Sequence, residues 1–137
     1  MIRQADVAAA GLESQTVAVS VRSPGSEIDW LQDCAMGDRL YAASLSKQVT
    51  AAAIAVLVRR DMLDVDAPIG SFLPDLPSWR NQVTSRHLLH HLGGMREPDC
   101  MAGPGHWTSL LALQRLQDSS DLVTAPGTVY RYSNAGY

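Results

Sequence analysis

The chain has 137 residues, 46% of them hydrophobic, and a formal net charge of −3 at pH 7. This size predicts a single modest globular domain over residues 1–137. The arginines are scattered and form no basic run, which argues against a nucleic-acid surface. The N-terminus lacks a basic region followed by an apolar core, so the sequence as written favours a cytoplasmic protein; a trimmed periplasmic or secreted protein would look the same.

The N-terminal third predicts a β-hairpin. Residues 16–22 alternate and are rich in β-branched side chains, as in a strand. Residues 23–26 contain Pro-Gly and predict a turn, after which 27–32 would return as the second strand. Residues 2–14 before the hairpin predict a weak helix.

A Ser-x-x-Lys pair opens the most apolar part of the chain. Ser44 and Lys47 are three residues apart, which places them one turn apart on one face of a helix. Lys47 is the only lysine, and a desolvated lysine can lose its proton and act as a base, whereas an arginine cannot. Residues 49–58 carry no charge, so the helix that follows should be buried, with Ser44 at its N-terminus. The apolar run is too short to span a membrane, which requires ~20 residues.

Shorter elements follow this helix, which we expect to fray around residues 60–61. Three prolines exclude a long helix: Pro68, Pro74 and Pro77. Thr84 can cap a short helix over 86–92, ended by Gly93-Gly94. After a loop over 96–106, residues 108–117 predict an amphipathic helix.

Three histidines have helical spacing but no fourth ligand. His87, His90 and His91 fall at i, i+3 and i+4, yet no Asp, Glu or Cys is placed to complete a metal site. We therefore expect structural histidines, no metal and no cofactor. Cys34 and Cys100 lie far apart in sequence and are expected to be free thiols.

The C-terminal segment carries a second candidate group. Tyr132 and Asn134 follow a Pro-Gly turn at 126–127 and, on an extended chain, would point the same way. A tyrosine hydroxyl can move protons, and an asparagine amide can both donate and accept hydrogen bonds. A capped turn with a core tyrosine is the plainer interpretation.

Taken together in order and spacing, these segments resemble the N-terminal half of the serine β-lactamase and penicillin-binding protein superfamily. Residues 41–76 resemble its nucleophile helix and the Leu-Pro stretch beyond, 83–95 resemble its Arg-His-Leu-Leu-Thr-His segment, and 125–137 resemble its Pro-Gly-Thr to Tyr-Ser-Asn segment. The branch most similar is that of class C β-lactamases, D-alanyl-D-alanine carboxypeptidases and related esterases. The resemblance implies an α+β fold with an antiparallel sheet packed against helices.

The same resemblance implies roles for four residues. Ser44 would be the nucleophile of an acyl-enzyme, and its backbone N–H would supply half of an oxyanion hole. Lys47 would help to deprotonate Ser44, Tyr132 would be the partner base or proton shuttle, and Asn134 would orient Lys47 and the substrate amide. The substrate would be a β-lactam, a D-Ala-D-Ala peptide or an ester.

The sequence departs from the family at several positions. Asp61 replaces a glycine that the family commonly has after the central helix, and nothing in the 137 residues matches the third motif, Lys-Thr-Gly or His-x-Gly. We therefore expect an incomplete member whose exposed apolar surface favours self-association and whose activity is weak. The alternative is a non-catalytic remnant or binding module that retains the fold.

Overall fold

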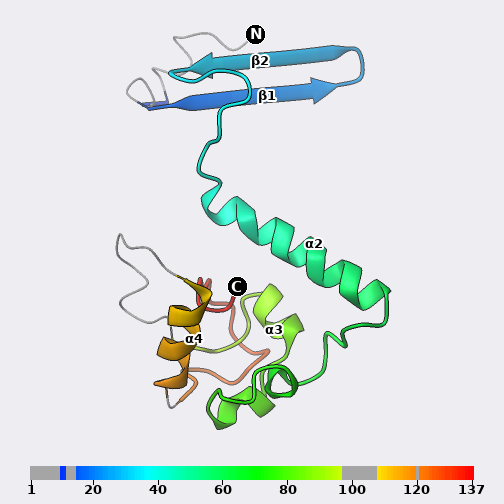
Figure 1. Cartoon of the computed structure of the whole chain (residues 1–137), viewed down its shortest axis with the longest axis vertical. Coiled ribbons are helices and arrows are strands. Elements are labelled where there is room, and N and C mark those ends of the chain that lie inside the picture. The colour runs from blue at the N-terminus through cyan, green and yellow to red at the C-terminus, as the bar shows by residue number, and fades with distance from the viewer. Residues whose placement is uncertain (1–9, 12–14, 97–107, 120) are drawn as a thin grey trace. The chain divides into compact units, whose positions relative to one another are not determined.

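The structure is a computed structural model that describes residues 10–11, 15–96, 108–119 and 121–137. It contains two compact units, Met1–Ala42 and Ala43–Tyr137 (Figure 1). The helix predicted over 2–14 lies almost wholly outside the described residues.

The first unit is the predicted β-hairpin. Strands β1 (Val17–Ser23) and β2 (Ser26–Gln32) pair antiparallel, with Val17 opposite Gln32 and Ser23 opposite Ser26. The two-residue connection requires the left-handed conformation that glycine adopts freely, and Gly25 has φ +78°. The alternation of β-branched residues and the Pro-Gly dipeptide thus produced the predicted element.

Polar pairs link the two strands across one face. Asp29 accepts hydrogen bonds from Ser20 Oγ at 2.8 Å and from the Arg22 guanidinium, whose Nη1 lies 2.9 Å from Asp29 Oδ1. The bond from Arg22, followed by that from Ser20, holds the pKa of the Asp29 carboxyl below its usual value. Cys34, after β2, donates its thiol proton to the Val17 carbonyl at 3.5 Å. Cys100 lies outside the described residues.

The second unit consists of helices and short 3₁₀ turns. Its elements in chain order are η1 (Ala43–Leu45), α2 (Ser46–Arg59), η2 (Ile69–Ser71), η3 (Ser78–Asn81), α3 (Ser85–Leu89) and α4 (Ser109–Gln117). As the three prolines predicted, no long helix forms between α2 and α3: Pro68 and Pro77 precede η2 and η3, and Pro74 lies between these turns. The amphipathic helix predicted over 108–117 is α4, and the Thr108 hydroxyl caps it by accepting from Leu111 N.

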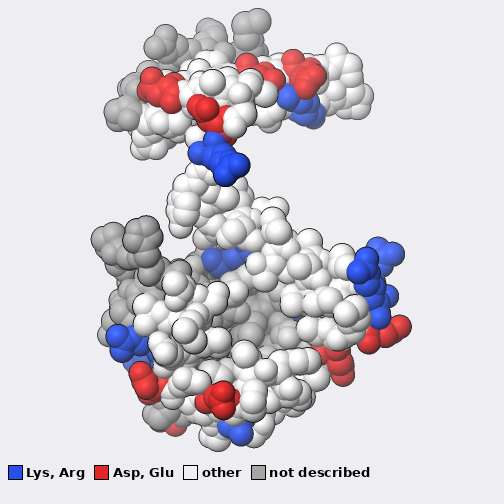
Figure 2. All heavy atoms as spheres, in the orientation of Figure 1, with Lys and Arg blue, Asp and Glu red and all other residues white. Residues whose placement is uncertain are grey.

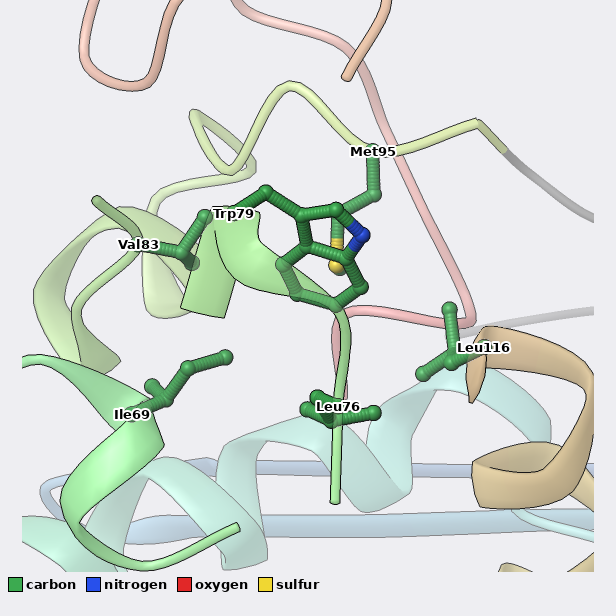
Figure 3. Close-up of a cluster of buried hydrophobic side chains, with 6 residues drawn as sticks. All are labelled: Ile69, Leu76, Trp79, Val83, Met95 and Leu116. Carbon is green, nitrogen blue, oxygen red and sulfur yellow. The ribbon is translucent and has the colours of Figure 1, made fainter. Parts of the chain in front are cut away.

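The core of this unit is small and is formed mainly by these turns and by α4. Its buried side chains, drawn in Figure 3, are Ile69, Leu76, Trp79, Val83, Met95 and Leu116. The Trp79 indole N–H donates to the Ser119 carbonyl at 2.9 Å, so its one polar group is satisfied. This bond ties the turn η3 to the residues that follow α4.

The prediction that α2 is a buried helix was wrong. None of its residues is buried, and apolar side chains on it are largely exposed, with Val49 at 73% and Val56 at 44%. The core of the second unit is assembled from residues 69–116, which leaves the apolar run of α2 outside it. An apolar sequence shows that a helix can be buried, but the partners that cover it must come from elsewhere.

Helix α3 begins as predicted but ends earlier. The Thr84 hydroxyl accepts from His87 N, and His87 Nδ1 accepts from Thr84 N, so the two form a capping box. The helix ends at Leu89 rather than at Gly93-Gly94, because His91 takes the left-handed conformation with φ +56°. Leu92 N donates to the His87 carbonyl at 2.7 Å, which completes a Schellman closure.

Two other left-handed positions fix the path of the chain. Asp61, with φ +55°, ends α2 where the resemblance expects glycine, and Asp accepts this conformation better than most residues. Gly94, with φ +72°, passes against the backbone of Thr124, and an added Cβ would overlap the Thr124 carbonyl. Val123 N donates to the Gly94 carbonyl at 2.8 Å, so this close approach joins the segments around residues 94 and 123.

The described part of the molecule is consistent with a partial α+β fold of the predicted class, with an antiparallel two-stranded sheet and a few helices. Among the described residues, no helix combines the length and hydropathy needed to cross a bilayer. Figure 2 shows that acidic and basic side chains are interspersed on the visible face of each unit.

Candidate active site

The Ser-x-x-Lys pair lies where a 3₁₀ turn passes into α2. Ser44 is in η1 rather than in the α-helix predicted for it, and Lys47 is the second residue of α2. The preceding Ala43 is left-handed, with φ +45°, and its carbonyl accepts from Ser46 Oγ at 2.7 Å. In a 3₁₀ turn residues three apart eclipse one another, which suits this pair. Lys47 Nζ lies 3.4 Å from Ser44 Oγ.

The Tyr-Ser-Asn segment reaches the same place from the C-terminal end of the chain. The predicted turn at Pro126-Gly127 is present: Gly127 has φ +81° and Thr128 N donates to the Ala125 carbonyl. Gly127 N also donates to the Leu92 carbonyl at 2.9 Å. The segment therefore runs back along the residues that follow α3.

The structure brings all four residues named from the sequence together. Ser44 Oγ and Tyr132 Oη lie 2.6 Å apart, a hydrogen bond in which either atom can be the donor. Lys47 Nζ donates to Asn134 Oδ1 at 2.8 Å and lies 5.0 Å from the centre of the Tyr132 ring. Tyr132 and Asn134 thus both contact the Ser-x-x-Lys pair, Tyr132 at Ser44 and Asn134 at Lys47. The contact between the two segments spans 88 residues of sequence, so only the fold can form it.

The site is open to solvent. Ser44 and Asn134 are exposed, Tyr132 is 46% exposed, and Lys47 is half-buried. A reactant can therefore approach the Ser44 oxygen directly. Such an oxygen, hydrogen-bonded to a phenol and close to an amine, can pass its proton to a neighbour as it attacks a carbonyl carbon.

A cavity of about 330 Å³ adjoins the site in the second unit. Its lining includes Asn134 and Tyr137 together with apolar side chains such as Trp79, Leu113 and Leu116. The cavity thus extends from the residue that binds Lys47 into the apolar interior.

Sequence reasoning missed the role of His91. The histidines at 87, 90 and 91 were interpreted as structural, and His87 does serve in the cap of α3. His91, however, packs its ring 4.6 Å from that of Tyr132, and its Nδ1 accepts from Ser133 N at 3.2 Å. The sequence feature that could have indicated these contacts is a histidine at the end of a helix, where glycine is the usual residue. Over the residues that the structure describes, no three His, Cys, Asp or Glu side chains gather as a metal site would require.

Comparison with known proteins gives the same family as these motifs. A mitochondrial protein of Bos taurus named serine beta-lactamase-like protein LACTB is 39% identical over 59 residues. That match covers 39% of this chain, and the chain spans only 11% of the length of that relative. No solved structure matches the chain. The family described as Beta-lactamase matches residues 9–137. The chain therefore belongs to the beta-lactamase family.

Proposed function

We propose that this protein is a serine hydrolase that forms an acyl-enzyme on Ser44. The observation that carries the proposal is the 2.6 Å contact between Ser44 Oγ and Tyr132 Oη, with Lys47 beside both. The family match, and the likeness to a protein named serine beta-lactamase-like, support the same class of nucleophile. The substrates proposed are carbonyl compounds of three kinds: a β-lactam, a D-Ala-D-Ala peptide or an ester.

The proposed first step is acylation. Ser44 Oγ attacks the carbonyl carbon while its proton passes to Tyr132 Oη, which takes part in this step as the phenolate and becomes the neutral phenol. Lys47, 3.4 Å from Ser44 Oγ, assists the deprotonation, and its positive charge stabilises negative charge on the phenol oxygen. The tetrahedral intermediate collapses with cleavage of the bond to the leaving nitrogen or oxygen, which takes up the proton.

Water would then complete the cycle. Its oxygen attacks the ester carbonyl on Ser44, a proton returns to Ser44 Oγ, and the acid is released. Asn134 holds Lys47 through its Oδ1 at 2.8 Å, which fixes the amine between the two motifs. The backbone N–H of Ser44, at the start of a helical segment, would stabilise one side of the oxyanion.

Mass spectrometry of the intact chain tests the proposal directly. The purified protein is incubated with a fluorescent penicillin and, separately, with a fluorophosphonate, with Ser44→Ala as the matched control. We expect one adduct per chain, absent from the Ser44→Ala variant. Circular dichroism of the same samples shows whether each chain is folded.

The result also separates the proposal from the non-catalytic alternative. A folded chain that no probe labels would overturn the acyl-enzyme and favour a remnant or binding module. An adduct that persists without release of product would mean that these residues carry acylation but not turnover. Release of penicilloate or of a simple ester's acid would measure turnover itself.

A further inference from the structure

His91 holds the backbone on both sides of Tyr132. The Arg131 N–H donates to the His91 carbonyl at 2.8 Å, and the Ser133 N–H donates to His91 Nδ1 at 3.2 Å. The residues before and after Tyr132 are thus tied to a single histidine at the end of α3. Ser133 is buried, with 8% of its surface exposed, so water cannot readily replace this bond.

The imidazole also supports the tyrosine ring. Its centre lies 4.6 Å from the Tyr132 ring with the planes tilted by 33°, and 5.2 Å from the Tyr137 ring. Tyr137 is anchored in turn, because its hydroxyl donates to the Leu89 carbonyl at 3.1 Å. Backbone and ring contacts together determine where Tyr132 Oη lies, 2.6 Å from Ser44 Oγ.

A helix end does not by itself require this histidine. His91 has φ +56°, a left-handed conformation that is strained for a residue with a side chain. Glycine would end α3 without that strain, yet it would supply neither the ring nor the Nδ1 acceptor. To accept from Ser133 N, Nδ1 must be unprotonated, so the ring is neutral with its proton on Nε2.

We infer that His91 is a positioning residue that places the Tyr132 hydroxyl at Ser44. This inference rests on the proposed function, because positioning matters only if Ser44 reacts. A misplacement of about 1 Å can cost a reaction about 100-fold, so we expect loss of His91 to slow acylation by about 10- to 100-fold.

Three substitutions separate the contributions of the side chain. His91→Gly accepts the left-handed backbone but removes both ring and acceptor. His91→Asn also tolerates this backbone and keeps an acceptor oxygen where Nδ1 stood, without the ring. His91→Phe keeps a ring but no acceptor. His90→Asn is the matched control, because His90 is the neighbouring, exposed histidine.

Two measurements are made on each variant of the full chain. The first is the acylation rate constant at saturating fluorescent penicillin, which is separate from probe affinity. The second is hydrogen exchange of the Ser133 amide by NMR, which reports the bond to Nδ1 whether or not Ser44 reacts. We expect slow acylation and lost Ser133 protection in His91→Gly. In His91→Asn we expect Ser133 protection to return and the acylation rate to recover in part, because the acceptor is present and the ring is not. His90→Asn should match the wild type.

Each other outcome has a defined meaning. Wild-type acylation in folded His91→Gly would overturn the inference, as would equal loss in the Gly and Asn variants. Loss of probe affinity alone, with Ser133 still protected, would also overturn it. An unlabelled but folded wild type would refute the proposed function instead. The Ser133 amide would then still decide whether His91 holds the segment, because unchanged protection in His91→Gly would contradict it.

Discussion

The two halves of the candidate site are supported very differently. The first half, Ser44 and Lys47, starts a helix with no buried residue, and the intervening Leu45 is 66% exposed. The second half, residues 130–137, is bonded to the end of α3 and contains the buried Ser133. The second half is therefore fixed by its bonds to the end of α3. The first half is fixed chiefly by its bonds to the second half. Chemistry and stability should accordingly respond to different substitutions.

The largest effect should come from Lys47, in the exposed half. Lys47→Met removes the amine that lies beside Ser44 Oγ and Asn134 Oδ1, and we expect acylation to slow by about 10²- to 10⁴-fold. Lys47→Arg keeps the positive charge that the proposed step uses but not the compact ammonium, so it should restore part of the rate. Labelling reactions quenched at a series of times measure the acylation rates of both variants. A Lys47→Met chain that reacts at the wild-type rate would refute the role given to this amine.

The next effect should be on stability, in the supported half. Gly94→Ala places a Cβ against the Thr124 carbonyl at a left-handed position, so we expect unfolding free energy to fall by more than about 2 kcal/mol. Gly127→Ala is the matched control: it is also left-handed, but its nearest neighbour is the movable His87 side chain at 3.2 Å. Urea denaturation should show the smaller loss for Gly127→Ala. Equal losses would mean that the left-handed backbone conformation, and not the overlap with the Thr124 carbonyl, causes the loss of stability.

A smaller, pH-dependent effect is expected where the chain leaving α2 joins α3. Arg86 donates to both carboxylate oxygens of Asp66, at 2.7 and 2.9 Å, and this hydrogen bonding lowers the pKa of the Asp66 carboxyl. Because the folded pKa is depressed, the pair stabilises the fold above the unfolded carboxyl value of ~3.9 and stops doing so as pH falls through the folded pKa. Asp66→Asn should therefore lower the melting temperature slightly at pH 7 and by less at pH 2. An equal change at both pH values would contradict the ion pair.

The smallest effect should come from the exposed face of α2. Val49 is 73% exposed, so Val49→Gln should change unfolding free energy by no more than about 0.5 kcal/mol. The core residue Trp79, 3% exposed, provides the contrast, since Trp79→Ala should cost about 3–5 kcal/mol. Chemical denaturation of both variants tests the difference. A large loss in Val49→Gln would mean that α2 is covered in solution.

Local signals in the sequence predicted the local structure well. Pro-Gly predicted the hairpin turn and Thr84 predicted the cap of α3, because each acts within a few residues. Spacing and residue type singled out Ser44 and Tyr132 separately, but their pairing came through resemblance to a family, since no local rule joins residues 88 apart. The catalytic roles themselves stay predictions until a labelled Ser44 is seen.

What sequence reasoning missed depends on packing between distant segments. The apolar run of α2 indicated burial, but burial also needs covering elements, and the second unit's core formed without it. In the sequence, His91 could not be told apart from the other two histidines of the predicted helix. What distinguishes it is its contacts with aromatic rings in residues 130–137. The periodicity of a helix does not encode such contacts.

The single lysine makes the site spectroscopically addressable. Lys47 carries the only side-chain amine among the 137 residues, and it lies between Ser44 and Asn134. Reductive methylation with ¹³C-formaldehyde would therefore label only this amine and the chain's N-terminus. The chemical shift of the methylated Lys47 amine would report its charge beside Ser44, and spectra recorded before and after acylation could be compared.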